Sequence, residues 1–246
     1  MLYLIGLGLY DEKDISLRGI DIAKDCDEIF LEGYTSVWRG KDELKEELGG
    51  DVKEVDRSSL EEKSDKIIDL SEDRDVAVMI PGDPLVATTH TELIIQARER
   101  GIKTQVIHSS SIYSAVAETG LQIYKFGKTT TIPKPEENYK PESPYEAIKE
   151  NQERGLHTLV LLDIKEGEGM KVKEGLSYLL DIERKRNEEV IKPNHKAVVF
   201  SAQGKESQIL YDEVDDLIEK DIRTPSVIIV PGKLHEKESE ALKLLG

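Results

Sequence analysis

Residues 75–93, DVAVMIPGDPLVATTHTEL, contain an apolar run, Val76–Ile80, that stops at a Pro-Gly-Asp-Pro turn. Both prolines of the turn lack an amide hydrogen, so this segment cannot continue a central strand. Residues 225–235, PSVIIVPGKLH, repeat the arrangement with an apolar run, a Pro-Gly stop and then polar residues. Open α/β sheets bind ligands at the carboxyl ends of their strands, so the two loops predict a ligand site at strand ends.

The first half of the chain alternates short apolar runs with charged, helix-like stretches. Strands are predicted at residues 1–8, 28–31, 52–55, 76–80 and 104–108, and helices at 16–24, 42–48, 60–70 and 87–100. Strands that are apolar on both faces and alternate with helices are typical of a parallel sheet covered on both sides.

The pattern changes after HSSSIYSAV, residues 108–116. FGKTTTIP, residues 126–133, predicts a strand exposed on one face, and the proline-rich residues 132–144 predict a loop. Later strands are predicted at 158–164, 197–200, 208–211 and 227–230, with helices at 145–154, 171–187, 213–220 and the C-terminus. We expect an α/β fold of two domains, 1–111 with a mostly parallel sheet and 112–246 with a mixed sheet.

Composition excludes several classes of function. The 246 residues include 50 acidic and 34 basic side chains, a net charge of −16 that would repel nucleic acid. A solvated surface explains this charge most simply, and the alternative is a basic patch on a partner. Cys26 is the only cysteine, which excludes an intrachain disulfide and indicates a reducing compartment. The short apolar runs and the absence of a basic leader predict a soluble, cytoplasmic protein without a membrane span.

The loop GLGLYDEKD, residues 6–14, raises the possibility of a dinucleotide site, because glycines let backbone amides approach a pyrophosphate. The fingerprint needs a third glycine, and Asp11 stands there instead. A carboxylate would repel pyrophosphate, so NAD and FAD are rejected. The remaining interpretation is a glycine turn followed by a helix capped near Asp14 or Ser16.

Two further strand ends carry polar residues. Asp83 either caps a helix that begins at Pro84 or faces a small ligand, and both roles are compatible. Ser109, Ser110 and Ser111 either cap a helix or bind a ligand. No histidine or acid is spaced to complete a serine triad, and no two of the five histidines have metal-ligand spacing. His235 alone follows a Pro-Gly stop, which places it near the expected cleft.

Five segments, taken together, resemble the signatures of the diphthine synthase family, in the same order and across nearly all of the chain. They are IGLGLYDEKDISLRG (5–19), PGDPLVATTH (81–90), IHSSSIYSAVAETGLQIYKFGKT (107–129), KENQERGLHTLVLLDIK (149–165) and VPGKLH (230–235). The Gly-Asp-Pro turn alone is similar to the wider superfamily of tetrapyrrole-type methyltransferases.

The resemblance implies a homodimeric, two-domain methyltransferase that binds S-adenosylmethionine in the cleft between its domains. The implied substrate is translation elongation factor 2, whose modified histidine is trimethylated on the amino group of its 3-amino-3-carboxypropyl chain during diphthamide biosynthesis. The implied cofactor contacts, carried over by motif, are Leu9, Asp83, Val86, Ser111, Ile112, Leu162, Ala202 and His235.

The implied reaction requires an uncharged amine, so the pocket must lower the pKa of that amine by desolvation or supply a path for its proton. No residue of the sequence declares itself as the base. Two alternatives remain open: a methyltransferase of the same fold that acts on a tetrapyrrole, and a protein that binds S-adenosylmethionine without catalysis.

Overall fold

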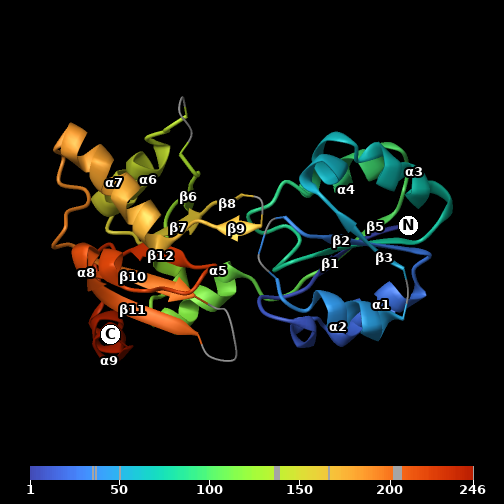
Figure 1. The fold of residues 1–246 in the computed structure, drawn as a ribbon, viewed down its shortest axis with the longest axis horizontal. Helices are drawn as coiled ribbons and strands as arrows, with labels where there is room; N and C mark the ends of the chain where they lie inside the picture. The colour runs from blue at the N-terminus through green and yellow to red at the C-terminus, as the bar shows by residue number, and fades with distance from the viewer. Residues whose placement is uncertain are drawn as a thin grey trace. The chain divides into compact units, whose positions relative to one another are not determined.

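The computed structural model describes residues 1–34, 36, 38–49, 51–135, 139–165, 167–201 and 207–245 (Figure 1). By its internal contacts the chain divides into two compact units, Met1–Ile112 and Tyr113–Gly246. Each unit is built around its own sheet and is described by itself.

The first unit contains a five-stranded sheet in the order β3-β2-β4-β1-β5, with every pairing parallel. The strand β4 (Val76–Ile80), the apolar run on which the sequence prediction was based, is buried along its whole length near the middle of the sheet. The other strands are β1 (Leu2–Gly6), β2 (Glu28–Glu32), β3 (Val52–Val55) and β5 (Thr104–Ile107). The predicted parallel α/β sheet is therefore confirmed, and all five carboxyl ends meet at one edge.

Helices cover both faces of this sheet. Ala23 of α1 (Leu17–Asp25) and Leu44 of α2 (Lys41–Leu48) belong to one apolar core, and α3 (Asp65–Asp73) and α4 (Thr91–Glu99) supply the other. Figure 1 shows these two pairs of helices on opposite sides of the strands. Ser16 caps α1 by accepting a hydrogen bond from the Gly19 amide, as the sequence predicted.

Two predicted helices of this unit are wrong in extent. The helix expected at 60–70 is divided into a π-helical turn, Ser58–Glu62, and α3, which begins at Asp65. The helix expected at 87–100 begins only at Thr91, because Ala87 has a positive φ of 56° and the preceding residues form turns. A left-handed residue cannot lie inside an α-helix, so the polar loop after β4 is longer than the apolar pattern indicated.

The second unit contains a mixed five-stranded sheet in the order β11-β10-β12-β7-β6, as predicted. Only β6 (Thr130–Ile132) and β7 (Thr158–Leu162) run parallel to each other. Strand β12 (Val227–Val230) is antiparallel to both β7 and β10 (Lys196–Ser201), and β11 (Gln208–Glu213) is antiparallel to β10. A short hairpin of β8 (Ile164–Lys165) and β9 (Glu168–Gly169), which the sequence did not predict, follows β7.

The helices of the second unit are α6 (Ser143–Glu153), α7 (Val172–Arg186), α8 (Val214–Glu219) and α9 (Glu236–Leu245), and the short α5 (Ile112–Ala115) lies at the boundary between the two units. Helices α6, α7 and α8 contribute to one apolar core on a face of the sheet. Within the described residues, no helix is long and apolar enough to cross a membrane.

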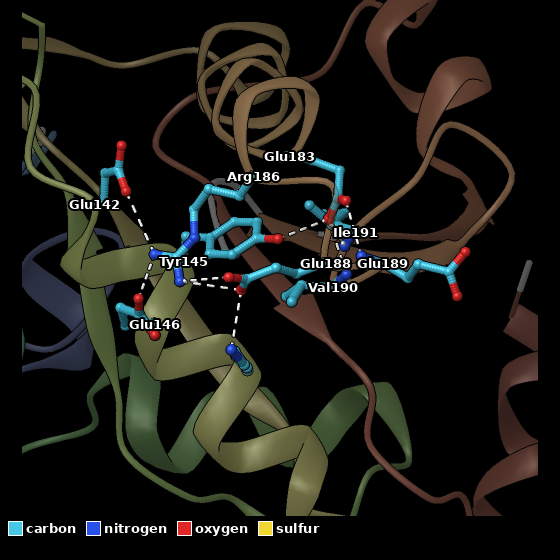
Figure 2. Close-up of polar contacts among 10 residues, drawn as sticks. Glu142, Tyr145, Glu146, Glu183, Arg186, Glu188, Glu189, Val190 and Ile191 are labelled. Carbon is cyan, nitrogen blue, oxygen red and sulfur yellow. Dashed lines mark hydrogen bonds and ion pairs between the residues drawn. The ribbon is translucent and has the colours of Figure 1, made fainter.

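A buried carboxylate closes the carboxyl end of α7 (Figure 2). Glu183 accepts hydrogen bonds from the Tyr145 hydroxyl (2.8 Å) and from the amides of Glu189 (2.8 Å), Val190 (2.8 Å) and Ile191 (3.1 Å). Burial acts to raise the pKa of Glu183, but these donors outweigh it and the pKa is lowered. This network fixes the turn after α7 and thereby the start of the path into β10.

Candidate functional site

The carboxyl edge of the parallel sheet is joined by a two-glycine bridge. The Gly8 amide donates to the Gly82 carbonyl (3.2 Å), and the Gly82 amide donates to the Gly8 carbonyl (2.7 Å). Both residues have positive φ angles, 77° and 73°. A Cβ on Gly8 would lie 2.4 Å from the Asp14 Cβ, whereas a Cβ on Gly82 would meet nothing within 4 Å. The bridge thus brings the loops after β1 and β4 together and leaves open space at Gly82.

Asp83 follows this bridge and is only 6% exposed. Its Oδ2 accepts from the His108 Nδ1 (2.8 Å) and the Ser109 amide (3.3 Å), and its Oδ1 accepts from the Leu85 amide (3.0 Å). The alternative that Asp83 caps a helix beginning at Pro84 is wrong, because α4 begins at Thr91. Asp83 instead ties the end of β4 to the end of β5.

The loop after β1 is tied to the same edge through Asp14. The Asp14 Oδ2 accepts from the amides of Leu9 (3.2 Å) and Tyr10 (2.8 Å), and the Ser109 hydroxyl donates to the Asp14 carbonyl (3.2 Å). Ser111, 7% exposed, lies between β5 and α5.

Five predicted contact residues therefore fall in loops at one sheet edge or directly after it. They are Leu9, Asp83, Val86, Ser111 and Ile112. The Val86 amide donates to the Asp83 carbonyl (3.2 Å), which closes the turn that holds these two residues together. The edge offers backbone amides, small hydroxyl side chains and the hydrogen-bonded carboxylates of Asp14 and Asp83, groups that can bind hydroxyl and amino functions of a polar ligand.

The mixed sheet separates two of the remaining predicted contacts. Leu162 ends β7, whereas His235 follows β12, which runs in the opposite direction. Val227 pairs with Leu161 and Val230 pairs with Thr158, so the carboxyl ends of the two strands lie at opposite ends of the sheet, about 13 Å apart along the strands. Ser201, the last residue of β10, lies at the Leu162 end. Ala202, also predicted as a contact, lies outside the described residues.

His235 is part of a buried network that the sequence did not reveal. Its amide donates to Glu238 Oε2 (2.6 Å), and its Nδ1 accepts from the Lys237 amide (3.3 Å), so it caps the start of α9. Glu238 is 0% exposed and also accepts from the His157 Nε2 (3.0 Å), and His157 Nδ1 accepts from the Gly232 amide (3.0 Å). The VPGKLH segment is thereby fixed to the amino end of β7.

Hydrogen bonding sets the charge of Glu238. Burial acts to raise the pKa of Glu238, but the His235 amide, Lys125, the Gln122 amide and His157 donate to it and lower the pKa to about 2. Burial lowers the pKa of His157, which is therefore neutral at neutral pH. The only signal for this network in the sequence was the spacing of His235 and Glu238, which fits a capping box.

The chain is similar to known proteins over its whole length. The family model of tetrapyrrole (corrin/porphyrin) methylases matches residues 1–217. Diphthine synthases of Methanocaldococcus jannaschii and Methanococcus maripaludis are 47% and 46% identical to this chain, and each alignment covers 100% of this chain and 98% of the relative. A crystal structure of a diphthine synthase superposes with a TM-score of 0.90 at 34% identity, covering 100% of this chain and 95% of the other.

The chain thus has the sequence and the fold of a methyltransferase. Its first unit is a parallel sheet with polar loops at one edge, and its second unit is a mixed sheet. The chain belongs to the tetrapyrrole (corrin/porphyrin) methylase family. Within that family it is a member of the diphthine synthases, as the resemblance of its motifs predicted.

Proposed function

We propose that this enzyme transfers methyl groups from S-adenosylmethionine to the amino group of a 3-amino-3-carboxypropyl-histidine on translation elongation factor 2, in diphthamide biosynthesis. One observation carries the proposal: enzymes named diphthine synthase are 46–47% identical to this chain over its whole length. The signature segments are spread along both units, so the likeness is not confined to a common cofactor fold.

The groups at the carboxyl edge of the parallel sheet fit S-adenosylmethionine. The open space at Gly82 admits a ligand close to the backbone, and Asp83 is a carboxylate held in place by three donors. Leu9, Val86, Ser111 and Ile112 supply backbone and short side chains beside it. When bound, the cofactor supplies a sulfonium-activated methyl group.

The proposal also includes Leu162, Ala202 and His235 of the second unit, and support for the three differs. Leu162 lies at the same end of the sheet as Ser201, the residue that precedes Ala202 in the sequence. His235 lies at the other end, with its amide and Nδ1 already engaged in the cap of α9. An extended ligand is needed to reach both ends.

Binding and water exclusion are the principal tasks of these residues in the transfer. The amine attacks as a neutral nucleophile, so a site that excludes water favours the reactive form and holds it in line. A residue that accepts the amine proton adds to this effect.

The proposal extends to a cytoplasmic homodimer. We infer that the protein substrate presents a basic face to the enzyme, because the net charge of −16 would then favour their encounter at low salt.

A methyl-transfer assay tests the function. Labelled S-adenosylmethionine is mixed with the enzyme and with elongation factor 2 that carries the 3-amino-3-carboxypropyl-histidine, and the mass of the modified peptide is measured. We expect a gain of three methyl groups on that histidine and none on unmodified elongation factor 2. Transfer to a tetrapyrrole in place of the protein, or cofactor binding without transfer, would contradict the proposal.

A further inference from the structure

A second polar cluster lies at the carboxyl ends of β2 and β4 and is used by none of the contacts above. His90, the residue before α4, is 2% exposed. Its Nε2 lies 3.4 Å from the Tyr34 hydroxyl, and the two rings meet edge to face with centroids 6.5 Å apart. The His90 ring also interacts with the Pro84 carbonyl, although its Nδ1 makes no hydrogen bond of ordinary geometry with any residue that the structure describes.

The position of His90 in the fold does not explain this burial. His90 makes no side-chain cap at the start of α4. A buried nitrogen without a well-formed hydrogen bond costs about 1–3 kcal/mol, and a native protein that keeps such a group calls for an explanation, of which a chemical role is one. An imidazole is also a side chain that can gain a proton near neutral pH without a change of fold.

The surroundings of the pair hold both groups neutral. Burial lowers the pKa of His90, while the Glu32 carboxylate, the Pro84 carbonyl and the Glu61 carboxylate offset this effect in part. Burial, Glu32 and Glu61 raise the pKa of Tyr34, and the Arg57 guanidinium, 5.3 Å from the ring centroid, opposes them. A neutral imidazole beside a protonated hydroxyl is the state that can take up one proton.

The placement of Tyr34 links this pair to the proposed methyl-transfer edge. Tyr34 follows β2 directly, and its amide donates to the Glu32 Oε1 (2.5 Å). β2 pairs with β4 in parallel, so Tyr34 lies at the sheet edge where Asp83 follows β4. Tyr34 is half-buried, whereas His90 is covered, so Tyr34 is the member of the pair that a substrate can reach.

We propose that Tyr34 and His90 form a proton relay that deprotonates the substrate amine, an inference that rests on the proposed function. The ammonium loses a proton to the Tyr34 oxygen while the Tyr34 hydroxyl proton passes to the His90 Nε2. The products are a neutral amine, an unchanged hydroxyl and an imidazolium near the carboxylates of Glu32 and Glu61. Each methyl group that arrives requires one such proton loss, and return of the proton to water through Tyr34 resets His90. Tyr34 is the catalytic residue of the relay, and His90 acts through it.

The test compares pH profiles of methyl transfer for the wild type, Tyr34→Phe and His90→Asn. At neutral pH, both variants are expected to lose about 100-fold in rate, the effect typical of a lost general base. Their rates are expected to approach that of the wild type at alkaline pH, where the substrate amine is already neutral. Cofactor affinity is expected to stay within about twofold, because the proposed cofactor contacts are untouched. Tyr3→Phe, at the other end of the same sheet, is the matched control and is expected to keep the wild-type profile.

Four outcomes would overturn the relay. A rate loss that is equal at every pH would indicate a structural role, and an unchanged rate would indicate none. A nitrogen NMR spectrum of the wild type that shows His90 charged at neutral pH would remove the acceptor. A wild type that transfers no methyl group at any pH, with cofactor bound, would overturn the proposed function together with the relay, whereas an active wild type with unshifted variants overturns the relay alone.

Discussion

The two sheets of the molecule distribute the residues at their strand ends in different ways. In the first unit all strands are parallel, so the loops after β1, β4 and β5 meet at one edge, where Asp83 joins two of them. In the second unit β12 runs against β7, so Leu162 and His235 lie at opposite ends. A motif that follows a buried strand thus predicts a shared site only when the direction of that strand is known.

The His235 end of the mixed sheet has the character of a structural anchor. Glu238 is buried with four hydrogen-bond donors around it and holds the start of α9 against β7. The two sheets thus differ in role: one edge of the parallel sheet is proposed to bind the cofactor, whereas the His235 end of the mixed sheet mainly stabilises the fold. Variants at each place can distinguish an effect on binding from an effect on stability.

Glu238→Ala is expected to have the largest effect. It leaves His157 and the Lys125 ammonium without their buried acceptor, and breaking a buried charged network costs about 3–5 kcal/mol of the free energy of unfolding. Urea unfolding measures the loss. The paired expectation is that folded Glu238→Ala binds S-adenosylmethionine as tightly as the wild type. A large loss of affinity at unchanged stability would mean that this end also binds ligand.

The same carboxylate predicts a dependence on acid. The pKa of Glu238 is lowered from 4.5 to about 2 in the folded protein, so its contribution is fully present above pH 4.5 and is lost as the pH falls toward 2. The shift corresponds to about 3 kcal/mol. The glutamine in Glu238→Gln does not titrate. The free energy of unfolding of this variant, measured by urea unfolding at a series of pH values, should therefore fall less steeply between pH 4.5 and 2 than that of the wild type. Parallel curves would contradict the assignment.

Asp83→Asn tests the proposed cofactor edge. In the wild type, the Leu85 amide donates to one carboxylate oxygen of Asp83 and His108 donates to the other. The asparagine amide has only one oxygen, so one of these two donors loses its acceptor. We expect S-adenosylmethionine to bind about 100-fold more weakly by titration calorimetry, because the change removes the carboxylate charge proposed to face the ligand and loosens the loop that holds it. Asp212→Asn, on β11 of the other sheet, is the control and should bind normally. Normal binding by Asp83→Asn would remove this edge from the site.

Much of the first unit could be predicted from the sequence because its signals are local. The buried run of β4 and the Ser16 cap each depend on a few adjacent residues, and both were confirmed. The helix expected from residue 87 was wrong because the positive φ of Ala87 results from how the loop after β4 packs, not from alanine itself.

The second unit was harder to predict in detail for a physical reason. An apolar strand such as β12 has the same sequence pattern whether it runs parallel or antiparallel to its neighbour, so the separation of Leu162 from His235 could not be foreseen. The Tyr34–His90 pair was missed because the two residues are far apart in the chain and come together only when β2 and β4 pair.

A pair of alanine variants distinguishes the two ends of the mixed sheet. Leu162→Ala is expected to weaken cofactor binding about 10-fold, since burying a leucine side chain against a ligand contributes about 1.5 kcal/mol. His235→Ala is expected to weaken cofactor binding by a smaller factor, about threefold, because the His235 amide and Nδ1 are already engaged in the cap of α9, and to lower stability by about 1 kcal/mol through the loss of that cap. Calorimetry and urea unfolding of the two proteins give both values. The reverse pattern would place the cofactor at the His235 end.

Gly82→Ala should give the smallest effect and tests the edge most directly. Gly82 has a φ of 73° and open space around a new Cβ, and Gly101, after α4, has a φ of 74° and the same open space. Both alanine variants should therefore lose about 1 kcal/mol of stability from the left-handed backbone alone. Only Gly82→Ala should also weaken S-adenosylmethionine binding, because its methyl group would occupy space proposed for the ligand. If the two variants bind S-adenosylmethionine equally well at equal stability, the ligand does not approach Gly82. Asp83 would then be the first residue of this loop that contacts it.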